Sequence, residues 1–269
     1  MLYIITCVSD EYCQYLTELR QNIKTMVQVP YKLVIAGNTT TQIECEDADS
    51  EIVINYKHNK GIFAAKYSAF EYLYRRGLDN GDYITFIDAD DYYQTTITKD
   101  LLPERSPIIY YDAFARNIED VRDCRKMFTW CFAFAPEILA KAYNTINDAI
   151  KEYGLIDLHD VYINSCEDML LFAPLLREGV TCVPIDTICH TENDTSATNS
   201  TTYTYDKVCN LFGEWSRLLT IASKLTYGRQ WLISTMNNCF GQYWHNYRQW
   251  IPFSERELCD EYIRQLQAL

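Results

Sequence analysis

The stretch Gly81-Asp-Tyr-Ile-Thr-Phe-Ile-Asp-Ala-Asp-Asp91 decides the fold, because an apolar run ends abruptly in three carboxylates. Residues 82–87 are apolar enough to form a buried strand, and Asp88, Asp90 and Asp91 follow it directly. Three carboxylates at one strand end repel one another unless a cation or hydrogen-bond donors compensate. The stretch therefore predicts a divalent ion, with a solvated acidic turn as the alternative. Oxygen ligands favour Mg²⁺ or Mn²⁺, which also accept phosphate oxygens.

On both sides of this stretch, short apolar runs alternate with segments of helical period, which is typical of βα units. We expect an α/β fold with a Rossmann-like, mostly parallel sheet flanked by helices. In such sheets ligands bind at the carboxyl ends of the strands. The predicted strands are 2–8, 31–36, 51–55, 82–87, 107–115, 127–135 and 180–190, the last as one strand or a pair of strands. The predicted helices are 10–28, 61–76, 136–153 and 166–178.

A polar segment at 191–206, rich in Thr, Ser, Asn and Asp, is the clearest loop in the chain. Three segments of helical period follow it, near 206–226, 229–250 and 254–268, without a strand pattern between them. We therefore predict a catalytic domain over residues 1–200 and a helical C-terminal subdomain over residues 201–269.

The net charge of −13 is unevenly distributed, with −15 in residues 1–206 and +2 in residues 207–269. Such an acidic chain disfavours general binding to nucleic acid or anionic lipid, which depends on Lys and Arg. The eleven cysteines include no Cys-x-x-Cys pair, so zinc knuckles and thioredoxin-like motifs are disfavoured and buried free thiols are expected. We expect no signal peptide and no integral membrane segment, and hence a cytoplasmic protein, with peripheral contact to a membrane left open.

The segment Asn59-Lys-Gly61-Ile-Phe-Ala-Ala-Lys66 lies one helix before the Asp88-Ala-Asp-Asp91 cluster. Together they resemble the inverting glycosyltransferases of family 2, which have the GT-A fold. The family pattern is Asn-x-Gly, three residues, Ala-Arg, a helix, and a strand ending in Asp-Ala-Asp-Asp, which includes the Asp-x-Asp (DXD) motif. The turn Ile5-Thr-Cys-Val-Ser9 and the pair Glu167-Asp168 also match, so the resemblance covers residues 1 to about 195.

The resemblance implies a role for each matching residue. Asp88 would contact the donor ribose and the water shell of the metal, Asp90 would coordinate Mn²⁺ or Mg²⁺, and Asp168 would be the catalytic base. His190 would bind the metal or the diphosphate, with a hydrogen-bonded structural histidine as the alternative. Lys66 stands at the family's Arg position and would meet the donor diphosphate, less directionally than an Arg. The remaining expected donor-binding residues are Thr6, Val8, Ser9, Asn38, Asn59, Gly61 and Ala89.

Two of these roles have simpler alternatives. A lone Lys66 on a helix is often solvated, and the acidic pair Glu167-Asp168 favours the start of its helix through the helix dipole alone. The chain also departs from the family at the end of the second strand, where Gly37-Asn38 replaces the usual Asp. Asn38 offers a donor and an acceptor to a uracil edge, and UDP is expected on family frequency.

Residues 215–253 contain no acidic side chain and interleave Arg and Lys with aromatic residues. These aromatics either pack a helical subdomain or form a platform for the acceptor, since aromatic faces stack on sugars and bases while cations pair with phosphates. An acceptor glycan, a lipid-linked glycan or a hydroxylated nucleic acid base would each fit such a platform.

The expected activity is metal-dependent, inverting transfer of a hexosyl or pentosyl group from a nucleotide-sugar to a hydroxyl. One alternative is a nucleotidyltransferase, which normally has a Gly-rich basic loop after the first strand, whereas Ser9-Asp-Glu11 is acidic. Another is an inactive sugar-nucleotide-binding or partner-binding module. Loss of Asp168 would favour that module, and Asp168 is present.

Overall fold

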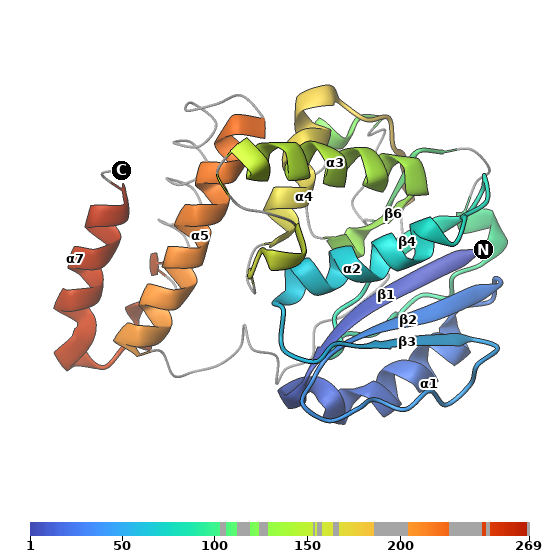
Figure 1. The fold of residues 1–269 in the computed structure, drawn as a ribbon, viewed down its shortest axis with the longest axis horizontal. Coiled ribbons are helices and arrows are strands. Elements are labelled where there is room, and N and C mark those ends of the chain that lie inside the picture. The colour runs from blue at the N-terminus through green and yellow to red at the C-terminus, as the bar shows by residue number, and fades with distance from the viewer. Residues whose placement is uncertain are drawn as a thin grey trace.

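Seven strands of the described residues form one sheet, and Figure 1 shows helices on both of its faces. The computed structural model describes residues 1–102, 106–111, 119–123, 129–152, 154, 158–163, 167–185, 204–225, 244–245 and 248–267. The strand order is β3-β2-β1-β4-β6-β5-β7. The strands are β1 (Leu2–Ser9), β2 (Tyr31–Asn38), β3 (Glu51–Asn55), β4 (Tyr83–Phe86), β5 (Ile108–Tyr111), β6 (Phe132–Phe134) and β7 (Val183–Ile185).

The sheet is parallel from β3 to β4, which confirms the expected βα architecture. β6 is the exception, since it runs antiparallel to both β4 and β5, and β7 is again parallel to β5. The strand expected over 127–135 is correspondingly short. Within that range a 3-10 turn, η4 (Thr129–Cys131), comes directly before β6.

Alternate residues of β1 face two separate apolar layers. Leu2, Ile4 and Val8 belong to the layer under α1 (Leu16–Met26). Ile5 belongs to the layer under α2 (Ile62–Arg75). Figure 1 shows α1 and α2 on opposite faces of the sheet. The helix expected from residue 10 begins as a 3-10 helix, η1 (Asp10–Tyr15), and becomes α-helical at Leu16.

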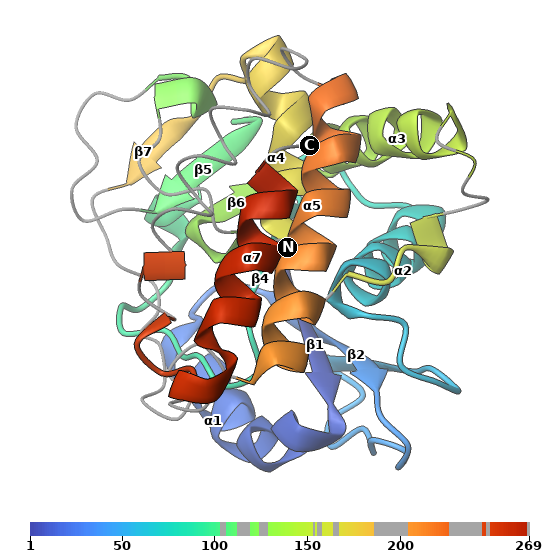
Figure 2. The ribbon, with the colours of Figure 1, turned by 90° about the vertical axis from the view of Figure 1, so that its left-hand side faces the viewer.

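The remaining helices extend the layer on the α2 side. α3 (Pro136–Glu152) and α4 (Glu167–Glu178) begin where the sequence predicts. α5 (Tyr205–Leu225) packs on both of them, and α7 (Arg256–Gln267) packs on α5, as Figure 2 also shows. Their buried side chains share one apolar cluster with α2, in which Phe172 of α4 and Phe212 of α5 take part.

Several expectations concern residues outside the described ranges, namely His190, the polar loop up to residue 203, and most of the helix expected near 229–250. The seven described cysteines are all free thiols, and three of them are buried. None of the helices that the structure describes has the length and apolar character needed to cross a membrane.

Candidate functional site

The candidate site lies where the strand order reverses. The chain moves outward from β1 to β2 and β3, then returns to place β4 on the other side of β1. In open α/β sheets the crevice outside the carboxyl ends of such strands is the usual ligand site. Ser9 ends β1, Asn38 ends β2, and Asp88 lies two residues after the end of β4. The topology therefore gathers three expected site residues at one edge.

Lys66 is the buried cation at this edge. The residue is 4% exposed, so the alternative of a solvated helix residue is wrong. Its Nζ atom lies 2.6 Å from Glu167 Oε1 and 3.6 Å from Asp88 Oδ1. The ammonium therefore joins the end of β4 to the first turn of α4, two segments that are far apart in the sequence.

The Asn-x-Gly motif shapes the start of the helix that carries Lys66. Gly61 precedes α2 with a φ of 81°, a conformation that favours glycine, and its amide donates to Asn59 Oδ1 at 2.8 Å. A Cβ atom on Gly61 would lie 2.9 Å from the backbone nitrogen of Ile163. Phe63 N donates to Ile163 O at 3.1 Å, so this close approach also fixes α2 against residues 162–163.

Asn38 differs from its expected role as a contact for the base edge. Its Nδ2 donates to Gly61 O at 3.1 Å, and its Oδ1 accepts from Lys60 N at 3.1 Å. The residue is only 3% exposed. The amide thus links the end of β2 to the 60–61 turn, where the Gly61 carbonyl also accepts from Ala65 N at 3.1 Å.

Asp168 occupies the first turn of α4 beside Glu167. Thr129 Oγ1 donates to Asp168 Oδ1 at 2.7 Å, and Thr129 is 3% exposed. Burial and the adjacent Glu167 raise the pKa of Asp168 to about 7, although Lys66 and the Thr129 hydrogen bond act in the opposite direction. A carboxylate with such a pKa can accept a proton near neutral pH, which goes beyond a helix-dipole role.

The sequence interpretation missed two residues of this cluster, Thr129 and Cys7. Cys7 lies near the carboxyl end of β1, where Asn38 Nδ2 approaches its sulfur at 3.6 Å. Burial raises the pKa of Cys7 to about 12, so the thiol is neutral. For Lys66 itself, burial acts to lower the pKa, but the neighbouring carboxylates, led by Glu167, hold it well above its usual range. The ammonium therefore stays charged.

The Asp88-to-Asp91 turn has one accessible carboxylate and two buried ones. The side chain of Asp88 is 52% exposed, whereas Asp90 and Asp91 are 8% and 6% exposed. Asp91 N donates to Asp88 O, which closes the turn. A simply solvated acidic turn therefore does not describe it. In the described part of the chain, no group of three His, Cys, Asp or Glu residues is arranged to hold a metal ion.

The remaining expected donor-binding residues are distributed around this edge. Thr6, Val8 and Ala89 are 0%, 0% and 3% exposed, so their side chains are enclosed by protein. Thr6 and Val8 lie on the α1 side of β1, as does Ala89 in the same apolar layer. Ser9 is partly exposed and Asn59 is exposed. The structure thus brings Lys66, Asp88 and Asp168 together with the unexpected Thr129, but not the side chains of Thr6 and Val8.

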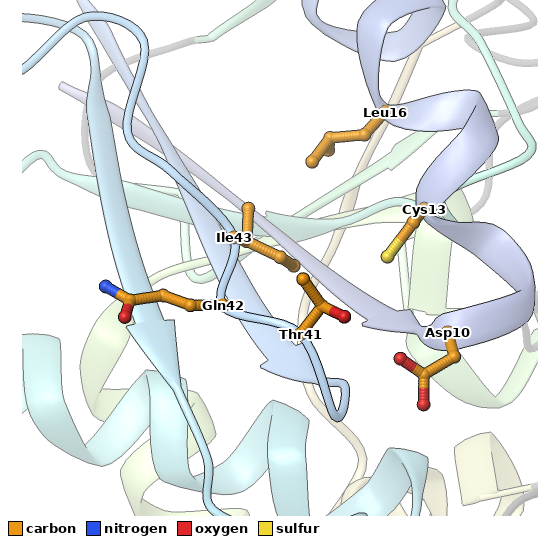
Figure 3. A pocket seen from close by; sticks show the side chains of 6 residues that line it. All are labelled: Asp10, Cys13, Leu16, Thr41, Gln42 and Ile43. Atoms are coloured by element: carbon orange, nitrogen blue, oxygen red, sulfur yellow. The ribbon is translucent and has the colours of Figure 1, made fainter.

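A cavity of about 360 Å³ adjoins the ends of β1 and β2 (Figure 3). It is lined from η1 and α1 by Asp10, Cys13 and Leu16, and from the segment after β2 by Thr41, Gln42 and Ile43. Asp10 Oδ1 accepts from Thr40 N at 2.9 Å and thereby ties the two walls together. The cavity lies on the α1 side of the sheet and contains no member of the Lys66 cluster.

Part of the segment expected to bind the acceptor has structural partners. Trp215 is buried at 2% exposure in the shared apolar cluster. Arg248 pairs with Asp260 of α7 at 2.8 Å, and Trp244 Nε1 donates to the same carboxylate at 3.1 Å. Phe253, in contrast, is 86% exposed. Among the described residues of 215–253, packing of the subdomain therefore accounts for Trp215, Trp244 and Arg248.

Comparison with known proteins bears on the fold. Neither a protein-family model nor a curated protein matches the sequence. The structure is similar to that of S. aureus TarS 1-349 in complex with UDP, with a TM-score of 0.54 and 13% identity over 99% of this chain and 87% of that chain. A second structure of S. aureus TarS 1-349 gives a TM-score of 0.47 and 12% identity with the same coverage. The similarity to the UDP complex shows that the chain has a GT-A-like fold.

Proposed function

We propose that the protein is a metal-dependent inverting glycosyltransferase that moves a hexosyl or pentosyl group from a UDP-sugar to a hydroxyl of an acceptor. The observation that carries this proposal is the cluster around Lys66. In this cluster the half-exposed carboxylate of Asp88 and the carboxylate of Asp168, whose pKa is raised, lie around one buried cation. The cluster lies at the edge of the sheet where the strand order reverses. UDP bound to the structurally similar TarS supports a uridine donor.

Inverting transfer requires a base on the face of the sugar opposite the leaving group. Asp168 suits that role because it has a pKa of about 7 and sits at the start of α4, beside rather than within the Asp88 turn. The acceptor oxygen forms a bond to the anomeric carbon while the bond from that carbon to the diphosphate breaks. The proton of the hydroxyl passes to Asp168, and the electron pair of the broken bond leaves with UDP.

Asp88 and Asp90 are the residues that would hold the metal. The donor set fits Mg²⁺ or Mn²⁺, because both residues offer oxygen only and these ions accept one or two carboxylates together with phosphate oxygens. When bound, the ion would neutralise charge on the departing diphosphate. Lys66 already donates toward Glu167, Thr129 and Asp88. We therefore infer that Lys66 holds the end of β4 and the start of α4 together. It would contact the diphosphate only if donor binding changes those contacts.

A thermal-shift panel tests the proposal, since a ligand that binds the native state raises its melting temperature. The probes are UDP, UDP-glucose, UDP-N-acetylglucosamine and UDP-galactose, with matching ADP and GDP controls, each with and without Mn²⁺. We expect a shift with uridine compounds that is larger with Mn²⁺ and that is lost in Asp88→Asn. If Asp148→Asn, an exposed control on α3, lost the shift equally, the assignment to Asp88 would be wrong.

Neither alternative function gains support from a particular observation. The segment after β1 that a nucleotidyltransferase would use is η1, whose first turn carries Asp10 and Glu11. An inactive binding module would have no need of a partly buried carboxylate with a pKa near neutrality, because desolvating such a group is costly. We expect the acceptor to be a glycan, a lipid-linked glycan or a hydroxylated nucleic acid base that contacts residues 215–253.

A further inference from the structure

Thr129 is a buried residue at the meeting point of the catalytic segments. It begins the short turn η4 just before β6 and is 3% exposed. Its hydroxyl lies 2.7 Å from Asp168 Oδ1 and 3.4 Å from Lys66 Nζ. One hydroxyl therefore contacts both the expected base and the buried cation.

The chemistry of the three groups fixes the direction of these hydrogen bonds. An ammonium has donors only, so Lys66 must donate to Thr129 Oγ1. The single hydroxyl proton of Thr129 is then directed to Asp168 Oδ1, because an ionised carboxylate only accepts. Among the residues that the structure describes, Asp168 Oδ2 receives no such donor.

Glu167 and Asp168 thus relate differently to Lys66. Glu167 contacts the ammonium directly at 2.6 Å, whereas Asp168 is connected to it through the Thr129 hydroxyl. A direct ion pair would hold Asp168 as a weak base, since an adjacent cation favours the charged form. The intervening hydroxyl orients the carboxylate without placing it in such a pair.

We propose that Thr129 is a positioning residue that holds Asp168 by Oδ1 and leaves Oδ2 to receive the proton of the acceptor hydroxyl. This inference rests on the proposed glycosyl transfer. In that step the acceptor oxygen bonds to the anomeric carbon, the bond from that carbon to the diphosphate oxygen breaks with its electron pair leaving on UDP, and the proton moves to Asp168 Oδ2. Thr129 takes no part in the bond changes.

The test compares Thr129→Val, which keeps the shape and removes the hydroxyl, with Thr129→Ser, which keeps the hydroxyl. Thr25→Val on the exposed surface of α1 is the matched control. UDP release from UDP-sugars is measured with Mn²⁺, using water as the acceptor when no other is known, and UDP affinity is measured by calorimetry. Circular dichroism checks that each variant is folded.

We expect Thr129→Val to lower kcat roughly 10- to 100-fold, the effect of losing a hydrogen bond to a charged group. Its KM for the donor and its UDP affinity should change by less than about twofold, since the lost contact acts on the chemical step. The acidic limb of its pH profile should also move to higher pH. The Thr129 hydrogen bond lowers the pKa of Asp168 in the wild type, so its removal raises that pKa. Thr129→Ser should restore most of kcat.

Three outcomes would overturn the positioning role while leaving the proposed function intact. In the first, a folded Thr129→Val keeps the wild-type kcat, and in the second it loses kcat and UDP affinity equally. In the third, a folded Thr129→Ser is as impaired as Thr129→Val. If Thr129→Val does not fold, the Ser variant alone decides, and its kcat must stay near the wild-type value. A wild-type protein that binds UDP but releases none from any UDP-sugar would instead refute the proposed function, and this inference with it.

Discussion

Replacing Lys66 with Met tests the energetic role of the buried cation. Met has a similar length and no charge, so the substitution removes the ion pairs while leaving little empty volume. The side chains of Lys66 and Glu167 are 5% and 12% exposed, and they meet at 2.6 Å. Removing one partner of such a pair leaves the other as an uncompensated buried charge.

The expected loss of unfolding free energy is about 3–5 kcal/mol, the usual cost of breaking a buried pair by removing one partner. The more distant contact to Asp88 adds little, because that carboxylate is half-exposed and screened by water. A typical domain has only about 5–15 kcal/mol of stability. Lys66→Met should therefore be folded but markedly less resistant to urea.

The loss should depend on pH in a defined direction. Lys66 lowers the pKa of Asp168, so without the cation burial raises this pKa further above its unfolded value, and the folded state binds more protons over that interval. The stability of Lys66→Met should then fall as pH rises from 5 to 8, relative to wild type. Adding Glu167→Gln should recover a large part of the loss, because the unpaired charge is removed with it.

Urea unfolding followed by circular dichroism at pH 5 and pH 8 measures these differences. Lys24→Met on the exposed surface of α1 is the control and should change stability by less than about 0.5 kcal/mol. A loss below about 1 kcal/mol for Lys66→Met, or a double variant no more stable than the single one, would refute the reasoning, since either result is incompatible with a strongly coupled buried pair.

Three further predictions concern the base, the start of α2 and the core. The value of kcat/KM for UDP release should fall about tenfold per pH unit below about 7 and level off above it, because Asp168 accepts a proton only when ionised; a midpoint near pH 4 would exclude this base. Gly61→Ala should lower the unfolding free energy measured in urea by about 2–4 kcal/mol. Gly77 is the control, because it has a similar φ of 83° and open space where its Cβ would lie, so Gly77→Ala should show only the backbone strain of about 1 kcal/mol. Equal losses in the two variants would rule out the contact with Ile163. Thr6→Val should raise the unfolding free energy by about 1 kcal/mol, since the Thr6 hydroxyl is buried without a hydrogen-bond partner among the described residues. Weaker UDP binding with no gain in thermal stability would instead place that hydroxyl in the donor site.

The parallel half of the fold could be predicted because its signals are local. α1 ends at Met26, four residues before Pro30, which cannot continue a helix, and β2 begins at Tyr31, directly after Pro30. The Asn-x-Gly motif likewise marks the start of α2, since Gly61 needs a positive φ. The antiparallel direction of β6 has no such local signal, because strand direction depends on the path of the intervening chain.

The sequence predicted members of the candidate site where a charged residue is part of a recognisable motif, as Lys66, Asp88 and Asp168 are. Thr129 was missed because it lies in an aromatic run that resembles a strand, and its partner Asp168 is 39 positions away. The sequence shows that Asn38 is polar, which led us to predict a ligand contact. Its actual hydrogen-bond partners, the Lys60 N–H and the Gly61 carbonyl, become its neighbours only in the folded chain. Polar side chains used for internal hydrogen bonds cannot be distinguished from ligand contacts by pattern alone.

The most direct test of glycosyl transfer is the release of UDP from UDP-sugars in the presence of Mn²⁺, measured for wild type and Asp168→Asn. The exposed Asp148→Asn on α3 serves as the matched control. We predict sustained release by wild type and by Asp148→Asn, and a loss of roughly 100-fold or more in kcat for Asp168→Asn, as expected for removal of a general base. Release by Asp168→Asn at the wild-type rate would contradict the account.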